Sequence, residues 1–272
     1  VVPVLDPRLK LLLVEVRGHG ESWPPPASGS IEQFAQDVLR VAEAEGAKNF
    51  YAGGHSIGGM IALEIGRASP ASVLGILSLE GWTGYQVVRD AFGSEPDSTL
   101  TPEVKARSEA ARQRAVGRWS AEQRKAFAQL WRRWDGYAFL KSTRIPILEI
   151  YGDRGRSLPK PEQLRIPVRD NIRIHWIAGA SHSYLFQKPA AVARAMDEFI
   201  RWEEIGRAPS TREFDVVVCG GTPGGIAAAI TAARLGHTVA LTEYHAHMGG
   251  MSASGLGKSD IETREAIGGL FR

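Results

Sequence analysis

The sequence predicts an α/β protein built on a doubly wound, mostly parallel sheet. Two observations carry this prediction. Short apolar runs, typical of strands buried on both faces, alternate with longer segments whose apolar residues recur at helical spacing. Most of these runs end in a glycine-rich turn that also holds polar residues. Strands that alternate with helices pair in parallel, because each helix returns the chain to the same end of the sheet.

The N-terminal part predicts one strand and one helix before the central glycine-rich turn. Residues 11–16, Leu-Leu-Leu-Val-Glu-Val, form an almost continuous apolar run and are predicted to be a buried strand. Ser30, with Gln33 three residues later, forms a capping box, so a helix is expected to begin there. The apolar residues that follow share one helical face, and Gly46 is predicted to end the helix.

Beyond this helix, strands follow one another with a single long interruption. Strands are predicted at 50–52, 73–79, 145–151 and 172–177, and an amphipathic helix is predicted after Pro189. Residues 85–136 break this rhythm with two helix starts and many Arg and Lys side chains. Aromatic residues at helical spacing favour a helical cap over an active site, with the basic residues in solvent. A nucleic-acid surface is the alternative, but no nucleic-acid motif accompanies the basic residues.

Composition excludes several classes of protein. The chain is 43% hydrophobic and 23% charged, as expected of a soluble globular protein, and its net charge of +3 is too small to indicate nucleic acid. No apolar run is long enough to span a membrane, and the single cysteine, Cys219, excludes an internal disulfide. We therefore expect neither a nucleic-acid partner nor a membrane partner. The compartment stays open, with the cytoplasm as the default.

The most informative stretch is 54–58, Gly-His-Ser-Ile-Gly, a G-x-S-x-G pattern between a predicted strand and a predicted helix. This context predicts a nucleophile elbow, in which the serine occupies a strained turn and the glycines let the helix pack close behind it. We therefore predict Ser56 as a nucleophile and the backbone N–H of Ile57, at the helix start, as an oxyanion donor. The alternative is a chance match in a glycine-rich chain.

Residues 11–202 resemble the α/β-hydrolase fold family, in which nucleophile, acid and histidine follow in that order at strand ends. The run 17–22, Arg-Gly-His-Gly-Glu-Ser, resembles the family's loop after its fourth strand, and the G-x-S-x-G turn matches its elbow. His182, with Pro189 seven residues later, matches the loop of the catalytic histidine. The resemblance implies that His182 is the base that activates Ser56, the alternative being a structural loop histidine. The family's earlier strands would lie before Val1, so we expect this chain to be a piece of a longer polypeptide.

The acid of this predicted triad stays open between two carboxylates. The common family pattern places an aspartate three residues after Gly152, and this chain has a glycine there. The dehalogenase-like branch takes its acid from the end of the sixth strand, which corresponds to Glu80. Asp153 is the other candidate, unless it caps its loop by pairing with Arg154 or Arg156. Glu80 in turn has the alternative of a polar group in the pocket.

The predicted chemistry is acyl transfer. Serine at the elbow implies an esterase, lactonase, amidase or carbon–carbon-bond hydrolase that forms an acyl-enzyme. Trp82, Trp131 and Trp134 lie near the predicted cap and indicate a small ester-like or apolar substrate, unless they serve packing alone. No cofactor is expected for this part of the chain.

The chain is predicted to hold two units. Residues 1–204 form the hydrolase-like domain with its cap at about 85–136, and the polar segment 205–212 is a linker. Residues 213–272 restart the pattern with a strand, a glycine-rich turn, an alanine-rich helix and a second strand, which make one βαβ unit.

The second unit resembles the start of the FAD-dependent oxidoreductases. Gly220, Thr222 and Gly225 occupy the three positions of the G-x-G-x-x-G fingerprint, with a threonine in place of the middle glycine, and Glu243 ends the second strand. The resemblance implies that Glu243 binds the hydroxyls of the adenosine ribose. One βαβ unit cannot enclose a flavin, so FAD binding is expected only in a full-length parent protein.

Three interpretations of function remain at this point. The first is a serine hydrolase fused to the start of a flavoprotein. The second is a parent protein whose identity is an FAD-dependent oxidoreductase and whose hydrolase-like region is non-catalytic. The third is a non-catalytic binding protein on a hydrolase scaffold.

Overall fold

The chain forms two compact units, Val1–Arg207 and Ala208–Arg272, and each is described by itself. The computed structural model describes residues 2–24, 29–93, 99–207, 213–243 and 248–249. The helix α9 (Pro189–Arg207) continues into the predicted linker 205–212. The rest of that linker, and most of the predicted second unit beyond 243, lie outside the described residues.

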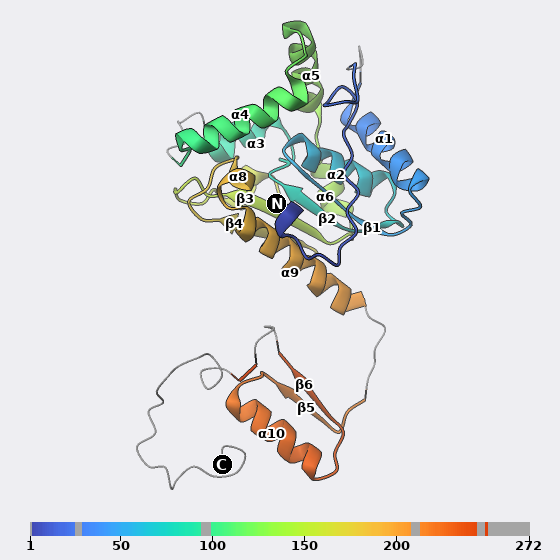
Figure 1. Cartoon of the computed structure of the whole chain (residues 1–272), viewed down its shortest axis with the longest axis vertical. Helices are drawn as coiled ribbons and strands as arrows, with labels where there is room; N and C mark the ends of the chain where they lie inside the picture. The colour runs from blue at the N-terminus through green and yellow to red at the C-terminus, as the bar shows by residue number, and fades with distance from the viewer. Residues whose placement is uncertain (1, 25–28, 94–98, 208–212, 244–247, 250–272) are drawn as a thin grey trace. The chain divides into compact units, whose positions relative to one another are not determined.

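A four-stranded parallel sheet in the order β1-β2-β3-β4 forms the centre of the first unit (Figure 1). The strands are β1 (Phe50–His55), β2 (Val73–Leu79), β3 (Ile147–Gly152) and β4 (Ile172–Ile177). Strands that follow one another in the chain are neighbours in the sheet, and all point the same way. Their carboxyl ends therefore meet at one edge, where α/β sheets hold their sites. The prediction of an α/β fold with a parallel sheet is confirmed.

Helices pack on both faces of this sheet. On one face, α1 (Ile31–Ala44) and α2 (Ile57–Ala68) share a buried core with β1 and β2, and on the other face α9 forms a second core. Ile76 belongs to the first core and its neighbour Leu77 to the second, as the alternation of side chains along a strand requires. Ser30 caps α1 as predicted, because its side chain accepts a hydrogen bond from the Gln33 N–H.

The segment between β2 and β3, called the cap below, is largely helical. It contains α3 (Tyr85–Val87), the π-helical turn η2 (Val88–Phe92), α4 (Pro102–Val116) and α5 (Ala121–Arg133). Gly84 and Asp135 form an isolated antiparallel bridge, so the two ends of this segment meet outside the sheet. Thr101 and Ser120 cap α4 and α5. The other short helices are η1 (Val2–Val4), α6 (Tyr137–Ser142), α7 (Pro161–Leu164) and α8 (Tyr184–Gln187).

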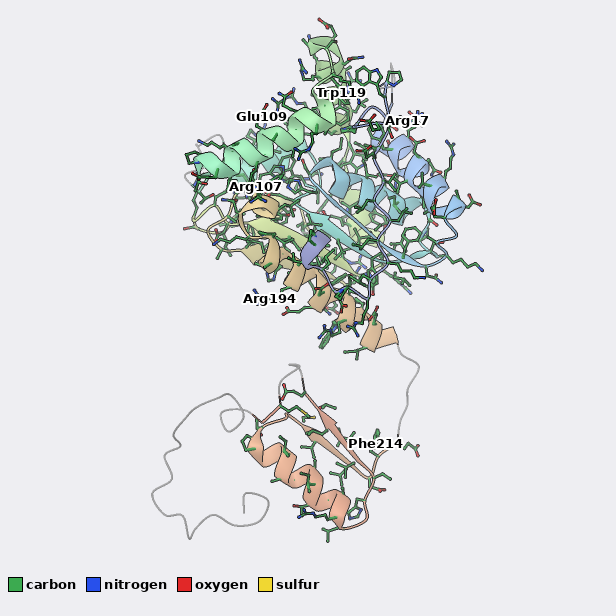
Figure 2. The ribbon with its side chains drawn as sticks, in the orientation of Figure 1. Arg17, Arg107, Glu109, Trp119, Arg194 and Phe214 are labelled. Carbon is green, nitrogen blue, oxygen red and sulfur yellow. The ribbon has the colours of Figure 1, made fainter. Side chains whose placement is uncertain are left out.

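The cap is tied to the N-terminal turn through aromatic residues. Trp119 follows α4 (Figure 2). Its indole N–H donates a hydrogen bond to the Gly18 carbonyl at 2.6 Å. The His19 ring lies 5.1 Å from the Trp119 ring and 5.2 Å from the Phe127 ring, edge to face in both cases. No residue of α4 is buried, so its basic side chains lie in solvent, as expected of the outside of a cap.

The predicted strand at 11–16 is wrong. This segment is irregular, and Leu11, Leu12 and Leu13 are exposed, with Leu13 at 72%. An apolar run indicates burial, but a strand also needs a neighbouring backbone that accepts and donates its hydrogen bonds. Within the described part of the chain, no strand pairs with this segment.

The second unit contains the predicted βαβ motif. Its elements are β5 (Val216–Cys219), α10 (Pro223–Arg234) and β6 (Val239–Thr242), and the two strands pair in parallel. Throughout the described residues, no helix combines the length and the apolar character that crossing a bilayer requires.

The start of α2 and the end of β2 approach each other through two glycines. A Cβ atom on Gly59 would lie 2.6 Å from the Gly81 Cα and 3.1 Å from the Ser78 Oγ. The first separation is shorter than any van der Waals contact of a carbon atom, so this position accepts only glycine. A Cβ atom on Gly58, one residue earlier, would meet nothing within 4 Å.

We predict that Gly59→Ala destabilises the first unit by about 1–3 kcal/mol, because the added methyl group forces α2 away from β2. Gly58→Ala is the matched control and should be neutral or stabilising by roughly 0.5–1 kcal/mol, since alanine favours a helix over glycine. Chemical denaturation measures both free energies of unfolding. Equal stability of the two variants would contradict the close approach.

Candidate active site

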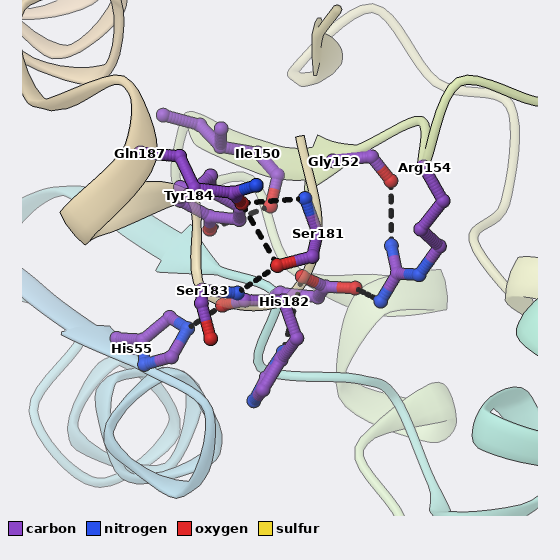
Figure 3. A network of polar contacts seen from close by, with 10 residues as sticks. His55, Ile150, Gly152, Arg154, Ser181, His182, Ser183, Tyr184 and Gln187 are labelled. Atoms are coloured by element: carbon purple, nitrogen blue, oxygen red, sulfur yellow. Dashed lines mark hydrogen bonds and ion pairs between the residues drawn. The ribbon is translucent and has the colours of Figure 1, made fainter. Parts of the chain in front are cut away.

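Three of the predicted site residues lie at the carboxyl edge of the sheet. Ser56 follows β1, Glu80 follows β2, and His182 lies on the loop between β4 and α8. The Ser56 N–H donates to the Leu79 carbonyl at 2.9 Å, so the turns after β1 and β2 are held together beside one another. Figure 3 shows the network of polar contacts around His182.

The turn at Ser56 has the geometry of a nucleophile elbow. Ser56 has φ 57° and ψ −122°, which strains a residue other than glycine, and α2 begins directly after it at Ile57. A Cβ atom on Gly54 would overlap the Gly58 carbonyl carbon, so this glycine allows the helix to fold back on the strand. The N–H of Ile57 belongs to the first helical turn, whose N–H groups have no acceptor within the helix.

Glu80 and His182 face each other. The Glu80 Oε2 lies 3.1 Å from the His182 Nδ1, the Glu80 side chain is fully buried, and the His182 side chain is 35% exposed. The alignment falls outside hydrogen-bond geometry, but neither atom bonds to any other described residue, so each is the other's polar partner. Hydrogen bonds of this kind are often poorly aligned without substrate.

Asp153, the other candidate acid, joins its own loop after β3 to the loop after β4. Its Oδ1 accepts hydrogen bonds from the Gly155 N–H at 2.8 Å and from the Gly179 N–H at 2.7 Å. Among the contacts of the described residues, Asp153 has none with His182. The structure therefore brings Glu80, and not Asp153, to the histidine.

Three neighbours of His182 and Glu80 were not identified as such from the sequence. Arg154 forms an ion pair with the Glu80 Oε1, whereas from the sequence Arg154 was only one of two alternative partners of Asp153. The Trp82 ring stacks on the His182 ring, with centroids 4.8 Å apart and planes inclined by 17°. His55 donates from Nε2 to the His182 carbonyl at 2.8 Å. The only sequence signal for these contacts was the position of each residue next to a strand end.

Burial controls the charge of two other groups near the site. Burial, together with the neighbouring His182, lowers the pKa of His55 to about 3, so His55 is neutral and acts as a hydrogen-bond donor. On β3, burial raises the pKa of Glu149 to about 7, an effect that the neighbouring Ser78 and Tyr151 hydroxyls oppose. No group of three metal-binding side chains occurs within the described residues.

The four predicted residues of the second unit meet at one turn. Gly220 has φ 105°, and a Cβ atom on Gly225 would overlap the Gly220 carbonyl oxygen. Thr222 caps α10 by accepting from the Gly225 N–H at 3.2 Å, and the Glu243 Oε2 accepts from the Gly221 N–H at 2.6 Å. A tight turn with its helix N-terminus and an acid directly after the adjacent strand fits the dinucleotide fingerprint.

Protein-family models match both units. The model of the alpha/beta hydrolase family matches residues 2–195, most of the chain, and the chain belongs to this family. The model of the FAD dependent oxidoreductases matches residues 215–272.

Individual relatives match more distantly. The chain is 32% identical over 81 residues to the "Putative carbamate hydrolase RutD" of Azorhizobium caulinodans, and the matched segment is 30% of this chain and 31% of that protein. The chain thus matches about a third of the length of this curated relative.

Two solved structures show the same fold. A thermophilic esterase from Thermogutta terrifontis is 22% identical, with a TM-score of 0.52 over 69% of this chain and 78% of its own. A proline iminopeptidase-related protein from Thermus thermophilus is 24% identical, with a TM-score of 0.52 over 68% of this chain and 77% of its own.

Proposed function

We propose that the first unit is a serine hydrolase that acts by acyl transfer on small ester-like substrates. The observation that carries this proposal is the contact between a fully buried Glu80 and His182, beside a strained serine elbow. Membership of the alpha/beta hydrolase family and the fold shared with an esterase support it.

In the proposed mechanism Ser56 is the nucleophile. Its hydroxyl oxygen attacks the substrate carbonyl carbon while the His182 Nε2 takes the proton, because a neutral serine hydroxyl is too weak a nucleophile alone. The buried Glu80 carboxylate stabilises the imidazolium that forms and holds its Nδ1 proton. The Ile57 N–H donates to the oxyanion of the tetrahedral intermediate.

The second half of the reaction reuses the same groups. The intermediate collapses, the carbon–oxygen bond to the leaving group breaks, and His182 gives its proton to the departing alkoxide. A water molecule then attacks the acyl-enzyme, again with His182 as base, and releases the carboxylic acid and Ser56.

The aromatic residues around His182 favour a substrate with an apolar or aromatic group. Trp82 covers one face of the His182 ring and lies 6.1 Å from the Trp131 ring of α5. Tyr85 lies 5.4 Å from Trp131, so the cap contributes a continuous aromatic cluster. Such a cluster stabilises an apolar acyl or alcohol group by burial.

The proposal predicts that Ser56→Ala abolishes hydrolysis of a short-chain p-nitrophenyl ester, with a loss of at least about 10³-fold in kcat. A fluorophosphonate probe should label the wild-type chain at Ser56, as identified by mass spectrometry of the modified peptide. Ser157→Ala, at an exposed loop serine, is the control and should keep both activities. A wild-type chain that neither hydrolyses the ester nor reacts with the probe would support a non-catalytic binding protein instead.

Glu80→Gln and Asp153→Asn separate the two candidate acids. Both changes keep the side-chain shape, but only the first removes the negative charge that faces His182. We expect Glu80→Gln to lower kcat by about 10³–10⁴-fold and Asp153→Asn to change it by less than about tenfold. A larger loss in Asp153→Asn, or equal activity in both, would overturn the assignment of Glu80.

For the second unit we propose descent from the FAD-dependent oxidoreductases without flavin binding by this chain alone. The Gly220–Gly225 turn would hold the pyrophosphate at the start of α10, and Glu243 would bind the ribose. A bound flavin would supply electron-transfer chemistry, but β5 and β6 are thinly covered, with Val217 58% exposed. The alternative is a parent protein that functions as an FAD-dependent oxidoreductase and whose hydrolase-like region is non-catalytic. The family match at 215–272 supports this alternative.

We predict that the chain purifies without the flavin absorption band at about 450 nm, because the described residues of this unit offer the nucleotide turn without an enclosure for the flavin ring. Absorption spectra of the purified chain, before and after addition of FAD and gel filtration, test this. A stoichiometric band that co-elutes with the protein would contradict it.

A further inference from the structure

Glu80 is held from two sides, and the mechanism proposed above uses only one of them. Its Oε2 faces His182, whereas its Oε1 forms an ion pair with the Arg154 guanidinium, from the loop after β3. The Arg154 side chain is only 10% exposed. A buried ion pair of this kind is stabilising only when the geometry around both charges is well defined.

The Arg154 guanidinium is itself fixed by two other contacts. It donates to the Gly152 carbonyl at 2.5 Å, a bond visible in Figure 3. It also lies 3.8 Å from the centroid of the Phe92 ring, which belongs to the η2 turn of the cap. Phe92 in turn stacks on Tyr151 of β3 at 5.7 Å. The backbone of Arg154 has φ 56°, a strained conformation that the surrounding contacts maintain.

Arg154 is the cation that pairs with Glu80, and the charge states of the other groups around Glu80 and His182 can be compared with it. The titratable groups that face Glu80 and His182 from other elements are His55, Glu149, Tyr151 and Tyr184. Burial lowers the pKa of His55 and raises the pKa of both tyrosines, so these three groups favour their neutral forms, whereas Glu149, with its pKa raised to about 7, titrates near neutral pH. The Arg154 guanidinium keeps its charge throughout the working pH range.

We propose that Arg154 is a positioning residue that orients the Glu80 carboxylate toward His182 and keeps the His182 ring available as a base. This inference rests on the proposed hydrolase function. A guanidinium on one carboxylate oxygen prevents rotation of the carboxylate and directs the other oxygen at the Nδ1 proton. Its positive charge also opposes a second positive charge on the imidazole. Phe92 links this arrangement to the cap.

The sign of the expected effect follows from the charges. Removal of Arg154 leaves a buried carboxylate without its cation, so the Glu80–His182 pair takes up a proton more readily, whichever of the two groups carries it. Proton uptake then occurs at higher pH, and the acidic limb of the pH profile of kcat/KM moves to higher pH.

We test this with Arg154→Met and Arg154→Lys, which both keep the Cβ atom and a long side chain. The histidine rings of the chain are labelled with ¹⁵N and titrated by NMR. In Arg154→Met, the Glu80–His182 pair should take up its proton at a pH higher by roughly one unit. Arg154→Lys should restore part of this displacement. In the hydrolysis assay, kcat should fall by about tenfold or more while KM changes little.

Phe92→Leu is a milder variant that keeps the ion pair and removes the ring beneath the guanidinium. It should displace the titration in the same direction by a smaller amount. Both titrations are repeated in chains that also carry Glu149→Gln, because this change removes a carboxyl group that titrates in the same pH range.

Arg165→Met is the matched control, because Arg165 also has a positive φ and an ion pair, here with Asp135 at 2.8 Å, but does not contact Glu80. The inference would be overturned if proton uptake by the Glu80–His182 pair moved no further in Arg154→Met and Phe92→Leu than in Arg165→Met. Arg154 would then be a structural residue. The NMR titration needs no turnover. If the wild-type chain shows no Ser56-dependent hydrolysis but Arg154→Met displaces the titration, only the hydrolase function is refuted. If the chain hydrolyses the ester but Arg154→Met does not displace the titration, only the role of Arg154 is refuted.

Discussion

The close approach of two glycines is the constraint on which the site depends. Gly59 in the first turn of α2 and Gly81 after β2 leave no room for a Cβ atom between them. Because of this contact, the elbow after β1 and the turn after β2 lie against each other, and the Ser56 N–H reaches the Leu79 carbonyl. A serine on one strand end and a carboxylate on the next are thereby held at one edge of the sheet.

Around this edge the backbone is strained and the charges are paired. Among the described residues other than glycine, five have positive φ, and four of them surround the site: Ser56, Glu80, Trp82 and Arg154. Each such residue costs about 1–3 kcal/mol and persists only where packing determines it fully, a pattern that clusters at functional sites. The buried Glu80 carboxylate likewise depends on its surroundings, because its charge is stabilised only while Arg154 and His182 stay in place.

Local patterns in the sequence were sufficient for most of the fold. The helix start at Ser30 was predicted from its capping box, which depends on two residues three positions apart. The strands β1 to β4 and the βαβ unit were predicted from short apolar runs between glycine-rich turns. The same rule failed at 11–16, because an apolar run looks the same whether or not another strand is there to pair with it.

Some residues of the site could likewise be predicted from local sequence, whereas others depend on contacts between distant residues. The elbow at Ser56 is a local motif, since its glycines and its helix lie within a few residues, and it could be predicted from the sequence alone. The choice between Glu80 and Asp153, and the partner of Arg154, could not, because these contacts join residues far apart in the chain, 74 positions in the case of Arg154 and Glu80. Spacing places a carboxylate at a strand end, but which one meets His182 is decided by the order of the strands and by the backbone N–H groups of Gly155 and Gly179 that engage Asp153. Tertiary packing therefore determined the polar partners of His182, and local sequence determined the serine beside it.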